Sequence, residues 1–321
     1  MTIDYAKAAG LLLSNDDILI ISHMNPDGDT LGCAFALCRA LIQKGKRARV
    51  ICSDHIPSKY SYLSDGLDIQ EFRPSFITTV DVADIKLLGG NLEDRYGEII
   101  NLSIDHHGSN KMFAEYNCVD SYAGAAAEII YKVILEMGVS IDTDIANCIY
   151  TGLSTDTGCF RYSNATAQTY RIAAEMLDAG AESSSINTVM FESKSLAFLK
   201  LQQLCIDGMK VFFNDRCSVV TLTQDMYKKS GIDDTESESI SSLARQVEGV
   251  YVGVTIRERE NGKCKVSIRS HSPVDAAEIC AKMNGGGHNR AAGCELSMSV
   301  EQTTQEVLKH IKQALIENGI I

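Results

Sequence analysis

The sequence predicts an α/β protein of two domains, in which a mostly parallel sheet flanked by helices is followed by a smaller α/β domain. Three observations lead to this prediction. Short β-branched runs alternate with helical stretches from residue 18 to about residue 160, as is typical of βαβ units. After about residue 208 the pattern changes to strands and hairpins. The 321 residues, 45% of them hydrophobic, are enough for two separate cores.

Strands of the first domain are expected where β-branched and apolar residues are concentrated, at 18–22, 48–53, 76–80 and 99–104. Its helices are expected where apolar residues recur three or four positions apart, at 31–44, 123–138, 144–155 and 167–179, with a further helix at 196–207. Strands that alternate with helices in this order imply a parallel sheet.

The second domain is expected to contain strands at 209–213, 218–223, 250–257 and 263–270, and helices at 237–248, 274–283 and 299–318. Asn261-Gly262 predicts a hairpin turn between the last two strands. Composition changes near residues 183–195, where serines interrupt the helices. We therefore assign residues 1–190 to the first domain, 191–208 to a linker helix and 209–321 to the second domain.

Charge and cysteine content restrict the class of protein. The 30 Lys and Arg against 42 Asp and Glu give a net charge of −12, which disfavours binding to long duplex nucleic acid but leaves room for a small anionic substrate held by metals. Eleven cysteines, with no Cys-x-x-Cys pair, predict a reducing compartment. No secretion signal and no apolar run of about 20 residues is present, so we expect a cytoplasmic protein that binds no membrane.

Acidic and histidine residues follow several of the predicted strands and one helix. In an open parallel sheet, the carboxyl ends of the strands border the crevice where ligands bind, so these residues are expected to converge. They are His23, Asp27, Asp29, Asp81, Asp105, His106, His107 and Asp156.

Each of these residues also has a simpler explanation. A single Asp in such a position is more often a helix cap or a turn residue, and a single His at a strand end more often bonds a backbone carbonyl. Four clusters at matching positions favour a metal site instead. Carboxylates so close together repel one another unless cations neutralise them.

The donor types indicate which metals the site would hold. Oxygen donors with some imidazole suit Mn²⁺ best, and Mg²⁺ also fits, whereas metals that prefer thiolates do not. Two such ions about 3.5–4 Å apart activate a bridging water and clamp the attacking and leaving oxygens of a phosphoester. The sequence therefore predicts two divalent cations and phosphoester hydrolysis.

A glycine-rich segment in the second domain is the other informative feature. Gly285, Gly286 and Gly287 would let backbone amides approach an anion, and His288 and Arg290 could supply charge or hydrogen bonds to a phosphate. The alternative is a flexible turn. On the preceding strand Lys265, Ser267 and Arg269 share one face, which either contacts the ligand or is solvated.

Together these residues resemble the DHH phosphoesterase superfamily, which is named for the triplet that stands here at Asp105-His106-His107. The His-x-x-Pro-Asp-Gly-Asp stretch from His23, then Asp81, the triplet and Asp156, look like its four motifs in order. The Gly-Gly-Gly-His run ending at His288 looks like the DHH-associated substrate domain. The resemblance implies a DHH catalytic domain and a DHH-associated domain with a cleft between them.

At this length, the chain looks most like the group of nanoRNase and pAp phosphatase enzymes. The resemblance implies hydrolysis of very short oligoribonucleotides, and of 3′-phosphoadenosine 5′-phosphate to AMP and phosphate, by a hydroxide that two metals activate. Two alternatives remain open, which are cleavage of linear dinucleotides such as pApA or pGpG and a non-catalytic nucleotide-binding module. A homodimer is also left open.

The resemblance further implies the role of each residue. One metal would be held by His23, Asp27 and Asp81, and the second by Asp29, Asp81, His106 and Asp156. His107 would contact the scissile phosphate or assist the leaving group, and Asp105 would orient the histidines. The terminal nucleotide would be held by Arg269, Gly285, Gly286, Gly287 and His288. Arg290, which departs from the family pattern, is expected as a further contact because of its charge.

Departures from the family pattern concern few positions. Cys33 stands where a serine is common, and Asn289-Arg290 where a lysine often follows the glycine-His run. The second departure is expected to affect which phosphate or base is preferred. Arg161 and Asn164 follow Asp156 closely, but polar residues there more often belong to a solvated loop.

Overall fold

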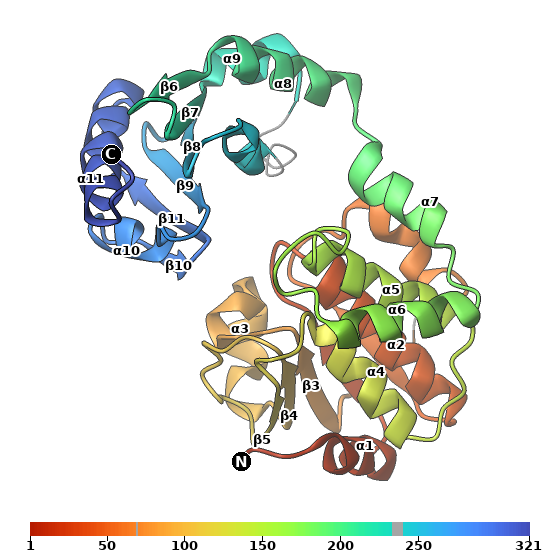
Figure 1. Ribbon diagram of the computed structural model, residues 1–321. Coiled ribbons are helices and arrows are strands. Elements are labelled where there is room, and N and C mark those ends of the chain that lie inside the picture. The colour runs from red at the N-terminus through yellow and green to blue at the C-terminus, as the bar shows by residue number, and fades with distance from the viewer. Residues whose placement is uncertain (69, 233–239) are drawn as a thin grey trace. The chain divides into compact units, whose positions relative to one another are not determined.

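The chain folds into two compact units, Met1–Ser193 and Lys194–Ile321, each with a sheet and a core of its own (Figure 1). The structure, a computed structural model, describes residues 1–68, 70–232 and 240–321. The predicted fold class is confirmed, since a parallel sheet flanked by helices is followed by a second, mixed sheet. Within the described ranges, no helix is both long and apolar enough to cross a membrane.

The first unit is built on a five-stranded sheet in the order β2-β1-β3-β4-β5, with every pair parallel. Its strands are β1 (Ile18–Ile21), β2 (Ala48–Ile51), β3 (Phe76–Val80), β4 (Leu102–Asp105) and β5 (Tyr116–Val119). Its α-helices are α1 (Tyr5–Ser14), α2 (Gly28–Gln43), α3 (Gly90–Tyr96), α4 (Ala126–Glu136), α5 (Thr143–Asp156), α6 (Ala167–Asp178) and α7 (Ser183–Asn187).

The continuous apolar run of β1 is explained by burial on both faces of the sheet. Ile18 and Ile20 join the core beneath α2, α4 and α5, whereas Leu19 and Ile21 pack with Leu92 of α3 on the opposite face. Because successive side chains of a strand point to opposite faces, a strand covered on both sides needs apolar residues throughout. Helices therefore cover both faces of this sheet.

Helices α2 and α5 approach each other closely because of glycines at their crossing. A Cβ atom on Gly32 would lie 2.4 Å from the carbonyl oxygen of Cys148, and one on Gly28 would lie 2.4 Å from Oγ1 of Thr155. Larger residues at these positions would therefore force the helices apart. The close approach brings the first turn of α2 beside the last turn of α5.

The second unit contains a six-stranded sheet in the order β10-β11-β9-β8-β7-β6, antiparallel except for the pair β7–β8. Helices α10 and α11 contribute to the core on one face, and α8 and α9 to the core on the other. The strands are β6 (Lys210–Phe212), β7 (Cys217–Leu222), β8 (Val252–Glu258), β9 (Cys264–Ser270), β10 (Gly286–His288) and β11 (Ala291–Leu296), and the helices are α8 (Leu196–Asp207), α9 (Gln224–Ser230), α10 (Ala276–Ala281) and α11 (Val300–Glu317).

Several local predictions differ from the structure. The helix predicted at 237–248 begins outside the described residues, and in its described part there is no α-helix but short 3-10 structure, including Ala244–Gln246. The strand predicted at 99–104 starts only at Leu102, because the preceding Gly97–Ile99 forms a 3-10 turn. The glycine-rich segment, for which a flexible turn is the alternative, forms the hairpin of β10 and β11, whose pairing partner β9 no local pattern reveals.

Candidate metal centre

Side chains from the carboxyl ends of β1, β3 and β4 meet one another in the first unit, and the last turn of α5 completes the group. All the residues predicted for this site are brought together in one network of contacts. They are His23, Asp27, Asp29, Asp81, Asp105, His106, His107 and Asp156.

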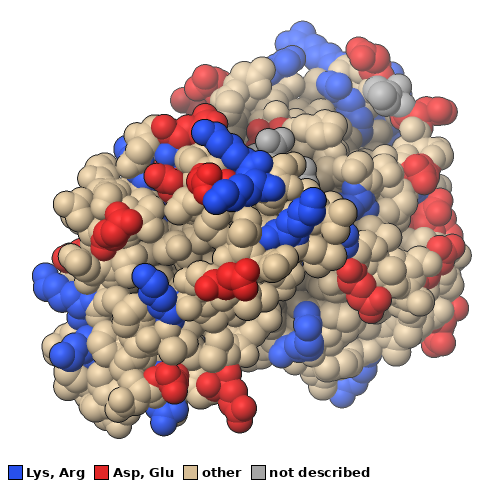
Figure 2. All heavy atoms as spheres, turned by 90° about the horizontal axis from the view of Figure 1, so that it is seen from above, with Lys and Arg blue, Asp and Glu red and all other residues tan. Residues whose placement is uncertain are grey.

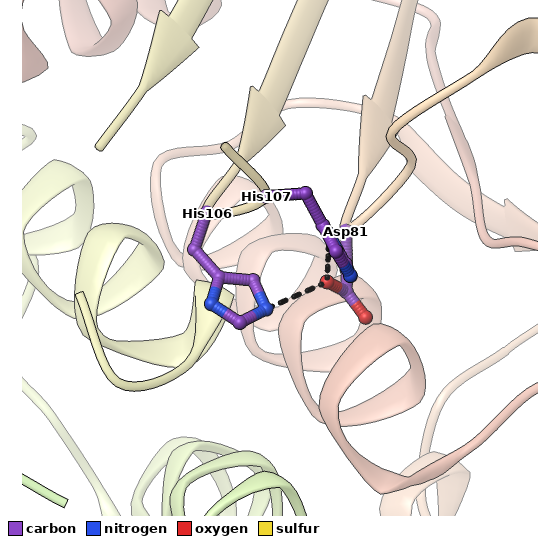
Figure 3. A group of neighbouring side chains, drawn as sticks. All are labelled: Asp81, His106 and His107. Atoms are coloured by element: carbon purple, nitrogen blue, oxygen red, sulfur yellow. Dashed lines mark ion pairs between the residues drawn. The ribbon is translucent and has the colours of Figure 1, made fainter. Parts of the chain in front are cut away.

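Asp81 lies at the centre of this group. It follows β3 with φ at 58°, a left-handed conformation that is uncommon outside glycine. Its Oδ1 lies 3.5 Å from Nε2 of His106 and 3.6 Å from Nδ1 of His107 (Figure 3), and its Oδ2 lies 3.5 Å from Nε2 of His23. Asp81 is 3% exposed, and its Oδ1 accepts no hydrogen bond from the described residues. Such an oxygen is costly to bury, and a cation would satisfy it.

His23 and His106 are oriented in the same way. Nδ1 of His23 lies 2.8 Å from the carbonyl oxygen of Met24, and Nδ1 of His106 lies 3.3 Å from that of Ala123. A carbonyl can only accept, so each Nδ1 carries the hydrogen and each Nε2 faces the carboxylates. This is the arrangement in which an imidazole binds a metal through Nε2.

Asp27 and Asp29 contact different backbone groups. Asp27 is the N-cap of α2 and accepts hydrogen bonds from the amides of Asp29 and Thr30 at 3.0 and 3.1 Å. The simpler explanation for this aspartate, a helix cap, therefore holds beside its place in the site. Asp29 accepts from the amides of Ala126 and Ala127 at the start of α4, at 2.7 and 3.0 Å. The two carboxylates therefore face different parts of the site.

Asp105 links His107 to Asn110 in a chain of hydrogen bonds that fixes the His107 ring. The Nδ1 group of His107 donates to Oδ1 of Asp105 at 2.8 Å, and Nδ2 of Asn110 donates to Oδ2 at 2.6 Å and to the carbonyl of Val82 at 3.1 Å. Burial disfavours the charge on Asp105, but the hydrogen bond and charge of His107, together with the hydrogen bond from Asn110 and the charge of His106, lower the pKa of Asp105. Burial likewise opposes the charge on His107, but its hydrogen bond to Asp105 and the charges of Asp81, Asp105 and Asp156 raise its pKa to about 9.

The remaining side chains form groups that can each hold one ion. His23, Asp27 and Asp81 form one group and Asp29, His106 and Asp156 form another, and a third consists of Asp81, His106 and His107. In every group the ligand atoms lie within 4.8 Å of one another. Metal bonds of about 2.0–2.6 Å put neighbouring ligand atoms about 3–4 Å apart, so the groups fit divalent cations.

The carboxylates repel one another. Burial and then the charge of Asp27 raise the pKa of Asp29 to about 7, and burial and then the charge of Asp29 raise the pKa of Asp156 to about 7. The same two causes, burial and Asp29, raise the pKa of Asp81 well above its usual range. Burial opposes the charge on His23, but hydrogen bonds to Asp27 and Asp81 raise its pKa to about 11. Cations in the site would remove this repulsion.

The predicted glycines of the second unit lie at the β10–β11 hairpin. A Cβ atom on Gly285 would lie 2.3 Å from the carbonyl oxygen of Gly293, and one on Gly287 would lie 2.6 Å from that of Ala291. Gly287 also has φ at 144°. Strand packing is therefore enough to explain two of these glycines, whereas Gly286 has open space around it.

The other predicted residues of the second unit lie on or beside the same hairpin. Arg269 of β9 is paired in register with Ala291 of β11, and His288 ends β10 as an exposed residue. Arg290 donates through Nη1 to the carbonyl of Val274 at 2.6 Å. Arg269 and His288 therefore lie on the two strands that flank Ala291, and Arg290 directly precedes it.

Some contacts of the site could not be foreseen from the sequence. Nothing in the local sequence distinguishes Asn110 from a turn residue. The sequence favours a solvated loop for Asn164 over a place in the site, but its Nδ2 lies 3.2 Å from Oδ2 of Asp156. Cys33 donates its thiol to Oδ1 of Asp29 at 3.4 Å, where a serine hydroxyl could do the same.

Comparison with known proteins identifies the class. Residues 17–153 match the N-terminal domain of the DHH family, and residues 216–317 match the DHHA1 domain. The chain therefore belongs to the DHH family, as the motifs indicated, and it is a hydrolase that acts on phosphoester bonds.

Individual relatives cover nearly the whole chain. It is 31% identical to the bifunctional oligoribonuclease and PAP phosphatase NrnA of Thermus thermophilus, over 95% of this chain and 92% of that one. A probable enzyme of the same name from Streptococcus mutans is 27% identical over 92% and 95%. The crystal structure of an exopolyphosphatase-related protein from Bacteroides fragilis matches with a TM-score of 0.87 at 25% identity, over 98% of this chain and 96% of that one.

Proposed function

We propose that this protein hydrolyses very short oligoribonucleotides, and also converts 3′-phosphoadenosine 5′-phosphate to AMP and phosphate. The observation that carries the proposal is the buried, hydrogen-bond-poor Asp81, which contacts histidines of two ligand groups at once. The names of the relatives from Thermus thermophilus and Streptococcus mutans support the choice of substrates.

Two divalent cations are part of this proposal. His23, Asp27 and Asp81 would hold one, and Asp29, Asp81, His106 and Asp156 would hold the other. When bound, such a pair supplies an activated water and neutralises charge on the phosphate. The mixture of carboxylate oxygens and imidazole nitrogens favours Mn²⁺, with Mg²⁺ as the alternative.

His107 is proposed to donate a proton to the leaving oxygen. Without metal, its hydrogen bond to Asp105 and the neighbouring carboxylates raise its pKa to about 9. Asp105 is assigned to neither cation, so its hydrogen bond would still favour the protonated ring when the cations are bound. Nδ1 is engaged with Asp105, so the proton that moves is the one on Nε2. Asp105 then has the task of orienting the ring and stabilising its charge, and Asn110 keeps Asp105 in position.

The second unit is proposed to bind the nucleotide through Arg269, His288, Arg290 and the amides of the glycine-rich segment.

The composition of the chain favours short substrates. Its net charge is −12, and it contains no Trp. On the face drawn in Figure 2, Lys and Arg side chains are interspersed with Asp and Glu. A long single strand would need a continuous basic groove with stacking aromatics. The eleven free cysteines fit action in the reducing cytoplasm.

A substrate panel tests the proposal. Purified protein with Mn²⁺ is given 3′-phosphoadenosine 5′-phosphate, a linear dinucleotide, a pentanucleotide, a long RNA and pyrophosphate, and released phosphate and mononucleotide are measured. We expect turnover of the bisphosphate and of the shortest RNAs, and little of the long RNA. Preference for pyrophosphate or for the long RNA would refute the substrate assignment, and binding without any turnover would indicate a nucleotide-binding module.

A further inference from the structure

One short backbone segment contacts two of the three side chains of a single candidate cation group. The segment is 123–127, which leads into α4, and the group is Asp29, His106 and Asp156. The carbonyl of Ala123 lies 3.3 Å from Nδ1 of His106, and the amides of Ala126 and Ala127 donate to the two oxygens of Asp29 at 2.7 and 3.0 Å.

The third side chain of the group is linked to the same segment through Asn164. Nδ2 of Asn164 donates to the carbonyl of Gly124 at 2.8 Å, and lies 3.2 Å from both the carbonyl oxygen and Oδ2 of Asp156. One amide group thus joins the carboxylate at the end of α5 to the segment that binds the other two ligands.

The segment is also held in place by residues that are not assigned to a cation. A Cβ atom on Gly124 would lie 2.6 Å from the carbonyl oxygen of Asn164 and 2.9 Å from Oγ1 of Thr169. The carboxylate of Glu128, which is 2% exposed, accepts hydrogen bonds from the amide of Gly124 at 3.1 Å and from Thr169 at 2.5 Å. The backbone near Gly124 therefore has little freedom to shift.

The group of His23, Asp27 and Asp81 is positioned by different backbone. His23 is oriented by the carbonyl of Met24, and Asp27 accepts from the amides of Asp29 and Thr30 in its own helix cap. The two groups share Asp81 as a neighbour but differ in what positions the rest of their ligands.

We propose that residues 123–127 form a common frame for the cation bound by Asp29, His106 and Asp156, and that Asn164 is the positioning residue that connects Asp156 to this frame. Loss of the Asn164 amide would let Asp156 turn away from its two partners. Only this cation should then bind more weakly. The inference deepens the proposed function, since it takes both cations of that proposal as given.

The test is a titration of the full chain with Mn²⁺. Calorimetry measures the binding, and electron paramagnetic resonance distinguishes the bound ions. Asn164→Ala should lower the affinity for one of the two Mn²⁺ ions by about 10- to 100-fold, which is the usual effect of removing a hydrogen-bond partner of a metal ligand. The affinity for the other ion should not change. Asn187→Ala is the matched control, because Asn187 is also half-buried in the first unit and donates to the hydroxyl of Tyr150 at 3.0 Å, away from the site.

Gly124→Ala gives an independent test, since its added methyl group would displace Asn164 without changing any ligand. This variant should also lower the affinity for the ion that Asn164→Ala affects. Should Asn164→Ala fail to fold, Asn164→Ser, which retains a short donor, takes its place and should show a smaller loss at that ion alone. Equal weakening of both ions, unchanged binding of both, or only one ion in the unmodified protein would overturn the inference. Two ions without hydrolysis of the substrate panel would instead overturn the proposed function alone.

Discussion

Asp81 shows why a single aspartate can matter more than its neighbours. It follows β3 in a left-handed conformation, and its carboxylate lies 3.5 Å from both His23 and His106, which follow two other strands. Both oxygens face imidazoles, and no described residue donates a hydrogen bond to Oδ1. A carboxylate in such a position is suited to bridging two cations.

Replacement of this residue should abolish the reaction. Asp81→Ala removes a ligand from both proposed ions, so we expect phosphate release to fall by at least about 100-fold and Mn²⁺ stoichiometry to fall with it. Asp144→Asn is the control, because Asp144 is exposed and only pairs with Arg39 at 3.0 Å. Activity that survives Asp81→Ala would rule out a mechanism with two metals.

His107 should differ from the metal ligands in its effect. His107→Gln removes the proposed proton donor but none of the atoms assigned to a cation, so kcat should fall by about 100- to 10,000-fold while Mn²⁺ affinity and KM change little. Substrates with a better leaving group, such as a nitrophenyl ester, should lose less rate. A loss confined to Mn²⁺ affinity would instead make His107 a ligand, as its position beside Asp81 also permits.

At the scale of helices and strands, the crossing of α2 and α5 decides where Asp29 and Asp156 lie. Glycines on both helices permit the approach, and the amides at the start of α4 bind Asp29 from a third element. The amphipathic pattern predicted α2 and α5 themselves to within a few residues. Periodicity does not indicate which helices cross, because it specifies a buried face and not its partner.

A methyl group at this crossing tests its importance. A Cβ atom on Gly152 would lie 2.7 Å from Oδ1 of Asp29, so Gly152→Ala should destabilise the protein by about 1–3 kcal/mol and weaken Mn²⁺ binding. Gly10→Ala is the control, because Gly10 is exposed within α1 with nothing within 4 Å, and should stabilise the helix by about 0.5–1 kcal/mol. Equal stability of the two variants would contradict the packing argument.

Over the whole molecule, the crowded carboxylates predict how stability without metal depends on pH. Asp29 and Asp156 have folded pKa values of about 7, above the unfolded value of about 3.9. Groups whose pKa is raised by folding stabilise the protein fully below the unfolded pKa, and this stabilisation is lost as pH rises through the folded pKa. His23 and His107, at about 11 and about 9, act in the same direction at higher pH.

With a chelator present, the unfolding temperature should therefore fall from about pH 5 to about pH 8. Added Mn²⁺ should restore it, and by more at the higher pH, because the ions bind the deprotonated carboxylates. Differential scanning calorimetry at several pH values with and without Mn²⁺ measures both effects. If the unfolding temperature without metal rose over this interval, the carboxylates would not repel one another as described.

The sequence by itself determined the fold class, the order of most elements, the DHH family and the residues that meet in the first unit. Alternating patterns and residue types at strand ends are local properties, and parallel strands bring such ends to one edge. Only the tertiary structure decided what depends on contacts distant in sequence. Such contacts are the pairing of β10 and β11 with β9, the approach of α2 to α5, and the attachment of Asp156 through Asn164 to residues 123–127. Local sequence does not specify such partners, because packing and hydrogen bonds between remote segments form only in the folded chain.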